Sequence, residues 1–326
     1  MRITRRVGLA AVLTTALAMT LAACAGSDNT PNGTGSNGEH TITVGSANFP
    51  ESQIIASMYA QVLRKGGFQV AEKPNIGSRE VYLKALQDGE ISLVPEYIGT
   101  LAEFFNTQLN GPDASTASPV ASGDPAKTFT NLRNLLGKVG GLQVTSYAKN
   151  ATDQNSFAVT KQTAARYGLS TMSDLGKANV RGKLVLGAGG ECAKRPFCLP
   201  GLQSVYGAKF KQSGGTYRKF ANPGDSKTLD ALKDGTIGIG LVFTSDGSVD
   251  DAGLVRLDDD KHLQPSDNIC TLARKGVLNS KAIGLVAAVN QTLTTDDLKT
   301  LNKKFNVDKE DADTIAQDYL ESRSLL

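Results

Sequence analysis

The sequence has few of the residues from which catalytic and metal sites are usually built. It contains two histidines, His40 and His262, and no Cys-x-x-Cys or His-x-x-x-His spacing. A zinc site is therefore not expected, and nothing indicates a cofactor. No Gly-x-Ser-x-Gly nucleophile elbow occurs, and the "GAGG" at 187–190 lacks the Gly-Lys-Ser/Thr of a phosphate loop. These absences favour a binding protein over an enzyme.

Beyond its N-terminal segment, the sequence also lacks an excess of positive charge. The formal charge of +3 includes Arg2, Arg5 and Arg6, which lie in a segment with the features of an export signal. Without them, 32 Lys and Arg face 32 Asp and Glu. No basic stripe remains, so the sequence does not support binding to nucleic acid. Its length of 326 residues and 40% hydrophobic content indicate a globular protein of about two domains.

Residues 1–23 have the pattern of a lipoprotein signal peptide. A basic head precedes an apolar run from Val7 to Leu21 that is short for a membrane span. "LAAC" at 21–24 resembles a bacterial lipobox, in which Cys24 becomes the lipidated first residue. A plain secretory signal with an incidental cysteine is the alternative. Residues 24–40 are polar and rich in Gly and Asn, which predicts a flexible tether. We expect an extracytoplasmic protein, lipid-anchored to the outer face of the cytoplasmic membrane.

Export decides how the remaining cysteines are interpreted, because exported chains meet an oxidising environment. Cys192 and Cys198 bracket five residues in "ECAKRPFC", within a Gly-flanked loop, and this spacing predicts a local disulfide. Cys270 lies in "NICTLA", where apolar residues alternate as in a strand. We expect Cys270 to be a buried free thiol.

Helical and strand patterns alternate along the chain. Strands are expected at 42–48 and 91–97, and amphipathic helices follow Pro50 and Ser78. A second alternation of the same kind begins near residue 156 and runs to about 243. Such alternation predicts an α/β fold in which helices connect parallel strands.

One pattern occurs twice, 146 positions apart. "YLKALQDGEISLVPEY" at 82–97 aligns with "TLDALKDGTIGIGLVF" at 228–243, so that Tyr97 falls on Phe243. Ligands of open α/β sheets bind beyond the carboxyl ends of the strands. We therefore expect Tyr97 and Phe243 on opposite walls of a cleft. The alternative is that both rings are core residues, but turn residues follow each ring directly, which favours the rim of a cleft.

Six segments together resemble the osmoprotectant-binding receptors of ABC importers, of the glycine betaine, choline and carnitine type. They are "SANFPESQIIASMYAQVL", "GSREVYLKALQDGEISLVPEYIGTL", "FAVTKQTAARYGLSTMSDL", "LPGLQSVYG", "LVFTSDG" and "LVRLDDDKH". The resemblance covers nearly all of residues 41–326. It implies a two-lobe, hinged periplasmic-binding-protein fold (type II-like) with a ligand cleft between the lobes. The implied lobes are 41–150 plus 265–326, and 151–264.

The resemblance also implies a function and partners. The protein would be a monomer that closes its lobes around a small polar or quaternary-ammonium osmolyte and delivers it to an ABC permease with its ATPase subunit. In that family a cage of tyrosines holds the quaternary ammonium through cation–π attraction. Here Tyr97 keeps its ring, Phe243 lacks the hydroxyl, and Asn155 and Asp267 stand where two further rings are expected. Thr100 is also kept.

This altered cage leaves other ligands open. Polyols, sugars and aromatic or polyphenolic compounds are alternatives, as is a ligand sensor not coupled to transport. Asp267 could supply a countercharge, and Arg79 either holds a polar or anionic end of the ligand or forms a surface ion pair. The predicted ligand-binding residues are Asn48, Phe49, Ser52, Arg79, Tyr97, Thr100, Asn155, Phe243, Thr244, Asp267 and Asn268.

Overall fold

The computed structural model describes residues 41–211 and 217–326. The predicted signal peptide, the tether and the lipidation site Cys24 lie outside the described residues. The strands are β1 (Ile42–Gly45), β2 (Val70–Lys73), β3 (Leu93–Tyr97), β4 (Leu142–Thr152), β5 (Asn155–Thr160), β6 (Leu186–Gly189), β7 (Arg218–Phe220), β8 (Ile239–Phe243), β9 (Leu254–Arg256) and β10 (Asn268–Arg274).

Helices connect most of these strands. They are α1 (Pro50–Lys65), α2 (Arg79–Asp88), α3 (Ile98–Asn110), α4 (Ala114–Ala117), α5 (Pro125–Val139), α6 (Lys161–Tyr167), α7 (Leu199–Tyr206), α8 (Ser226–Lys233), α9 (Ser248–Asp251), α10 (Ser280–Thr292), α11 (Thr295–Lys303) and α12 (Ala312–Ser322). A 3-10 helix spans Met172–Gly176 and a π-helix spans Lys304–Asp308. No helix in the described part of the chain is long and apolar enough to cross a membrane.

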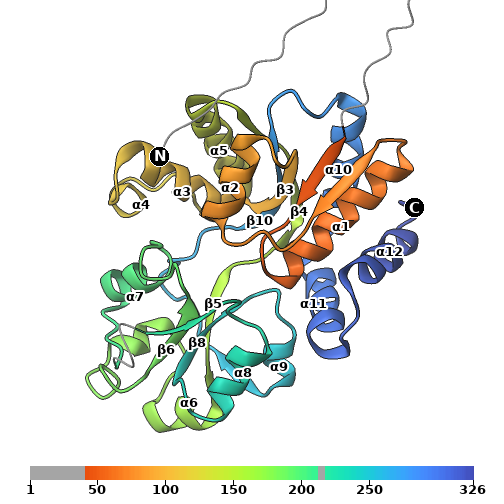
Figure 1. Cartoon of the computed structure of the whole chain (residues 1–326). Coiled ribbons are helices and arrows are strands. Elements are labelled where there is room, and N and C mark those ends of the chain that lie inside the picture. Colours follow the sequence, from red (N-terminus) through yellow and green to blue (C-terminus); the bar gives the residue numbers. More distant parts are fainter. Residues whose placement is uncertain (1–40, 212–216) are drawn as a thin grey trace, which may run out of the picture. The chain divides into compact units, whose positions relative to one another are not determined.

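The strands form two five-stranded sheets of equivalent order. The first runs β2-β1-β3-β10-β4 and the second β7-β6-β8-β5-β9. In Figure 1 the first sheet combines strands from the red and orange start of the chain with β10, which comes from its blue end. The chain passes to the second sheet between Thr152 and Asn155 and returns between Arg256 and Asn268.

The expected parallel pairing holds on one side of each sheet only. Strands β1, β2 and β3 are parallel, and so are β6, β7 and β8. The expectation is wrong for β10 and β5, which run antiparallel to their neighbours. Each is the strand that the chain enters after crossing from the other sheet, and no helical crossover precedes it to reset its direction.

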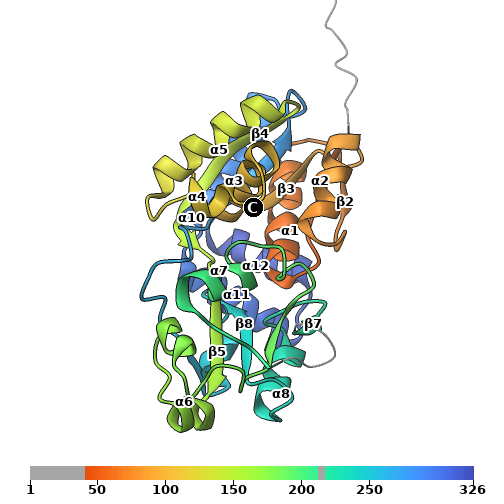
Figure 2. The ribbon, with the colours of Figure 1, turned by 90° about the vertical axis from the view of Figure 1, so that its left-hand side faces the viewer.

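Apolar side chains on both faces of the first sheet explain its position between two layers of helices. One core cluster joins α1 with α10, α11 and α12, and another joins α2, α3 and α5. Figure 2 shows α3 and α5 side by side in the second of these layers. The second sheet also has two clusters, which include α7 on one face and α8 on the other. Both sheets are therefore buried on both faces, as is usual for mixed α/β sheets covered by helices on each side.

The repeated sequence pattern forms the same unit in each sheet. Helix α2 ends at Asp88 and is capped by Gly89, whose φ of 84° lets the chain turn sharply into β3. In the second copy Gly235 takes a φ of 78° between α8 and β8. Because glycine adopts this left-handed conformation without strain, the two Asp-Gly turns produce equivalent connections. The two strands end at Tyr97 and Phe243.

Candidate functional site

A cavity of about 700 Å³ is lined by loops from both sheets. From the first sheet come the segment before α1, the start of α2 and the first turns of α3. From the second come the loop after β6, the loop after β7 and the end of β8. The strand ends that sequence analysis singled out therefore meet at one cavity, and both Tyr97 and Phe243 line it.

Eight of the predicted ligand-binding residues line this cavity, namely Asn48, Phe49, Arg79, Tyr97, Thr100, Asn155, Phe243 and Asp267. The other three lie outside the lining because the fold uses their polar groups. The Ser52 hydroxyl accepts a hydrogen bond from Ala47 N (2.9 Å), and the Thr244 hydroxyl accepts one from Gln154 N (2.9 Å). The amide of Asn268 donates to the carbonyl oxygens of Ala148 (2.9 Å) and Lys149 (3.1 Å).

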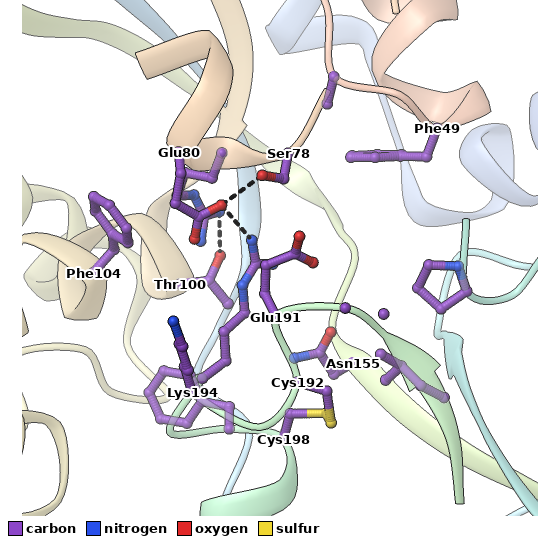
Figure 3. Close-up of a pocket in the computed structure, with 18 of the residues that line it drawn as sticks. Phe49, Ser78, Glu80, Thr100, Phe104, Asn155, Glu191, Cys192, Lys194 and Cys198 are labelled. Carbon is purple, nitrogen blue, oxygen red and sulfur yellow. Dashed lines mark hydrogen bonds and ion pairs between the residues drawn. A yellow bond between two sulfur atoms is a disulfide. The ribbon is translucent and has the colours of Figure 1, made fainter. Parts of the chain in front are cut away.

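Three aromatic rings form a row that lines the cavity. The ring of Phe49 lies 6.1 Å from that of Tyr97 and 6.3 Å from that of Phe243, measured between centroids. Figure 3 shows the Phe49 ring projecting from the loop before α1 into the cavity. The row joins the two sheets, because Tyr97 ends β3 and Phe243 ends β8. Its faces can attract a cation and cover its apolar groups.

The Tyr97 hydroxyl is tied to a buried carboxylate. It donates to Oε1 of Glu51 (2.6 Å), and the amide of Asn302 donates to Oε2 (2.7 Å). The same amide contacts the carbonyl oxygen and hydroxyl of Ser245, each at 3.2 Å. Burial raises the pKa of Glu51, and the hydrogen bonds from Tyr97, Ser245 and Asn302 partly offset that rise. This network fixes the ring and connects it to the segment that follows β8.

Arg79 forms a buried ion pair. Its Nε and Nη2 donate to the two carboxylate oxygens of Glu96 at 2.6 and 2.8 Å, and Nη2 also donates to the Thr100 hydroxyl (2.9 Å). Tyr82 donates a further hydrogen bond to Glu96. Burial lowers the pKa of Arg79, but the charge of Glu96 outweighs this effect, so the pKa lies well above its usual value. The surface ion pair considered for Arg79 is therefore wrong: its partner is buried, and only Nη1 is without a partner among the described residues.

Two more buried carboxylates line the cavity. Asp267 accepts hydrogen bonds at Oδ1 from the backbone N–H groups of Gly99 (2.8 Å) and Thr100 (3.0 Å), and so caps the start of α3. Burial raises its pKa to about 6. Asp153 accepts from Ser245 N at Oδ1 (3.1 Å). Burial and the nearby charge of Glu51 raise the pKa of Asp153 well above its usual value. Since the raised pKa values show that negative charge is disfavoured here, a cation bound beside these two acids would be stabilised by relieving that cost.

A disulfide-bonded loop borders the cavity on the side of the second sheet. Cys192 and Cys198 form the disulfide, with Cα atoms 5.1 Å apart, and Figure 3 shows it below Asn155. Arg195 of this loop lies 3.6 Å from Glu80 at the start of α2, which in turn accepts from the Ser78 hydroxyl (2.7 Å). The loop thus contacts a residue that belongs to the first sheet's side of the cavity. Cys270 is a buried free thiol in β10.

Several residues of the site were missed by sequence analysis. Glu51, Glu96 and Asp153 are buried acids whose partners lie 46, 17 and 92 positions away. A local pattern does not show such pairs, although "PEY" at 95–97 places an acid inside an otherwise apolar strand, which is itself a signal. Within the described residues no cluster of three or more His, Cys, Asp or Glu could hold a metal ion.

Comparison with known proteins identifies the family of the chain. Residues 40–322 match the family described as the substrate binding domain of ABC-type glycine betaine transport systems. The chain is 26% identical over 287 residues to the glycine betaine-binding protein YehZ of Escherichia coli K12, covering 86% of this chain and 90% of that protein. It is 24% identical over 297 residues to the carnitine transport binding protein OpuCC of Listeria monocytogenes, covering 90% of each.

Solved structures share the fold. The crystal structure of a glycine betaine/carnitine/choline ABC transporter protein matches with a TM-score of 0.62 at 22% identity, covering 87% of this chain and 99% of that one. The expected periplasmic-binding-protein fold is thereby confirmed. The family that matches residues 40–322 consists of extracytoplasmic solute-binding proteins of ABC importers. With a family match over residues 40–322, the chain belongs to the substrate-binding domains of ABC-type glycine betaine transport systems.

Proposed function

We propose that this protein binds a small betaine-type cation or zwitterion in the cavity between its two sheets and delivers it to an ABC import permease. The observation that carries the proposal is the row of Tyr97, Phe49 and Phe243, with Asp153 and Asp267 lining the same cavity. Aromatic faces and buried carboxylates both stabilise a cation, the first through the ring quadrupole and the second through charge. The names of the relatives, glycine betaine-binding and carnitine transport binding proteins, support this ligand class.

Closure of two lobes would retain the ligand. We propose lobes of 41–150 plus 265–326, and of 151–264, because each range contains the strands of one sheet apart from the ends of β4. Asn48 donates to the carbonyl oxygen of Ala221 (3.4 Å), and Arg195 approaches Glu80, so contacts on both sides of the cavity are available to hold a closed state. A ligand that touches both lobes shifts the equilibrium toward closure by its differential affinity for that state.

A binding measurement tests the ligand class. Titration calorimetry of the purified protein with glycine betaine, carnitine and their N-demethylated analogues should give saturable binding by at least one of them. Glucose and glycerol serve as neutral controls and should not bind. Saturable binding of a neutral polyol or sugar, with none by the cations, would contradict the proposal and favour the alternative ligands.

We propose further that the protein is a monomer without catalytic activity, held at the outer face of the membrane by a lipid on Cys24. Support for the anchor comes from the basic head, the short apolar run and the "LAAC" sequence. Replacement of Cys24 by serine should abolish the mass of the attached lipid in intact-mass spectrometry and release the protein from membranes. A wild-type chain without lipid would overturn the anchor and leave the binding proposal untouched.

A further inference from the structure

Hydrogen-bond acceptors line the same cavity as the aromatic row. Asp153 and Asp267 line the cavity with exposed fractions of only 7% and 3%. They are adjacent, because Asp153 N donates to the carbonyl oxygen of Asp267 (2.9 Å). Asn155 lines the same cavity and is the register partner of Phe243 on the neighbouring strand. Two carboxylates and one amide oxygen thus accompany the rings.

Each of these groups keeps acceptor capacity that the backbone N–H groups do not use. The N–H groups that bond to Asp153 and Asp267 reach Oδ1 in both cases, so Oδ2 has at most a hydroxyl neighbour, Ser245 or Thr100. Asn155 donates through Nδ2 to Gln264 (3.3 Å), and its Oδ1 has no donor among the described residues. The Asn155 side chain points into the cavity in Figure 3. Asn155 Oδ1 is therefore open to a ligand donor, and each carboxyl group can accept a ligand donor beside its hydroxyl neighbour.

A quaternary ammonium satisfies such acceptors poorly. It neutralises their charge but has no N–H, and a buried acceptor left without a donor destabilises the complex. An ammonium or amidinium group that retains an N–H supplies both the charge and the hydrogen bond, and charge-assisted hydrogen bonds are the stronger kind. The rings of the aromatic row can then pack against the remaining faces of the ligand's positively charged group.

We infer that the positively charged group of the preferred ligand carries at least one N–H donor; this inference rests on the proposed function. The N–H donates to Asp267 and Asp153, and the rest of the charged group packs against Phe49 and Phe243. The ligand class is a secondary or tertiary ammonium, a guanidinium or an imidazolium compound. Two of the neighbouring charged groups are already paired within the fold, although Arg79 also lies close enough to lower the pKa of Asp267. Arg79 is paired with Glu96, and Glu51 accepts from Tyr97 and Asn302.

Ligand pairs that differ by one N-methyl group test the inference. Glycine betaine with N,N-dimethylglycine, and carnitine with its N,N-dimethyl analogue norcarnitine, each compare no N–H with one N–H at constant carboxylate. Calorimetry at pH 7.5 should show the N–H member of at least one pair binding about tenfold more tightly. That factor is what remains when the contact energy of the missing methyl group is subtracted from the energy of one charge-assisted hydrogen bond. Equal binding within both pairs, or tighter binding of the methylated members, would overturn the inference.

Matched variants assign the preference to the carboxylates. Asp267→Asn and Asp153→Asn should reduce the tenfold preference to twofold or less, whereas Asp230→Asn, on the exposed face of α8, should leave it unchanged. A preference that survives in both cavity variants would contradict the assignment. If no compound of either pair binds to the wild-type protein, the proposed function itself fails. If the methylated compounds bind best, the proposed function stands and only this inference fails.

Discussion

The two copies of the helix, Asp-Gly turn and strand unit share their order of elements but have different interiors. In the first copy, Arg79 at the start of α2 reaches Glu96 in β3, and Tyr82 donates to the same carboxylate. The equivalent positions in the second copy are Asp225 and Val242, 146 residues further on. Asp225 accepts from Thr228 N (3.1 Å) as the N-cap of α8, and Val242 is simply buried.

This difference extends to the ring at the end of each strand. Tyr97 is 9% exposed, belongs to a core cluster and is fixed by its hydrogen bond to Glu51. Phe243 has no polar group and is held by packing. It contacts Phe49 and lies against Gly224, where a Cβ atom would be 3.1 Å from its ring. One wall of the cavity is therefore fixed by a polar network, while the other wall relies on apolar contact.

The largest effect is expected from breaking the polar interior of the first copy. Arg79→Met leaves Glu96 as a buried carboxylate without its cation, and loss of one partner from a buried pair destabilises by about 3–5 kcal/mol. Asp225→Ala at the equivalent position removes only a helix cap and should cost about 1 kcal/mol. Urea denaturation of the two variants measures both values. Similar losses in the two variants would show that the two interiors do not differ as described.

The two rings should also differ in their contribution to folding. Tyr97→Ala removes a core ring and the donor to buried Glu51, so the free energy of unfolding should fall by about 3–5 kcal/mol. Phe243→Ala should cost less than about 3 kcal/mol, because part of its ring faces the cavity. Thermal and urea unfolding of both variants without ligand make the comparison. A larger loss for Phe243→Ala would reverse the assignment of the fixed and packed walls.

A smaller and pH-dependent effect is expected at Asp267. Burial raises its pKa to about 6 in the folded protein, against about 4 when unfolded, so the folded state binds this proton more tightly. The resulting stability is present below about pH 4 and is lost as the pH rises to about 6. Arg79, Glu96 and the Thr100 backbone face the same carboxyl and are included in that shift.

Asp267→Asn removes this titration. Without ligand, the variant should be more stable than the wild type at pH 7.5 by up to about 3 kcal/mol, and the difference should shrink toward zero at pH 4. Thermal unfolding across that range measures it. A difference that is constant with pH would mean that Asp267 titrates normally.

Sequence patterns gave the framework of this protein for local reasons. The Asp-Gly turns at 88–89 and 234–235 need left-handed glycine, and the helices around them show their apolar faces at regular spacing. The short spacing of Cys192 and Cys198 likewise determines which sulfurs can meet. Each of these features depends on a few neighbouring residues, so one sequence suffices to predict it.

The polar interior depends on contacts between distant segments, and the sequence did not reveal it. Glu51 and Asn302 are 251 positions apart, and Asp267 reaches α3 from 167 positions away. The direction of β5 and β10 also follows from where the chain crosses between sheets. Phe49 was predicted as a ligand contact, but its position between the other two rings follows only from the assembled fold.

The central claim is that one cation contacts aromatic rings from both sheets, and the affinity of Phe243→Ala for the tightest-binding compound of the ligand panel tests it most directly. Loss of the ring should weaken binding by about 1–3 kcal/mol, or about 5- to 150-fold, through lost contact area and cation–π attraction. Phe129→Ala is the control, since that ring packs against Tyr147 outside the cavity lining and should leave affinity unchanged. Wild-type affinity in Phe243→Ala, with the protein folded, would contradict the account.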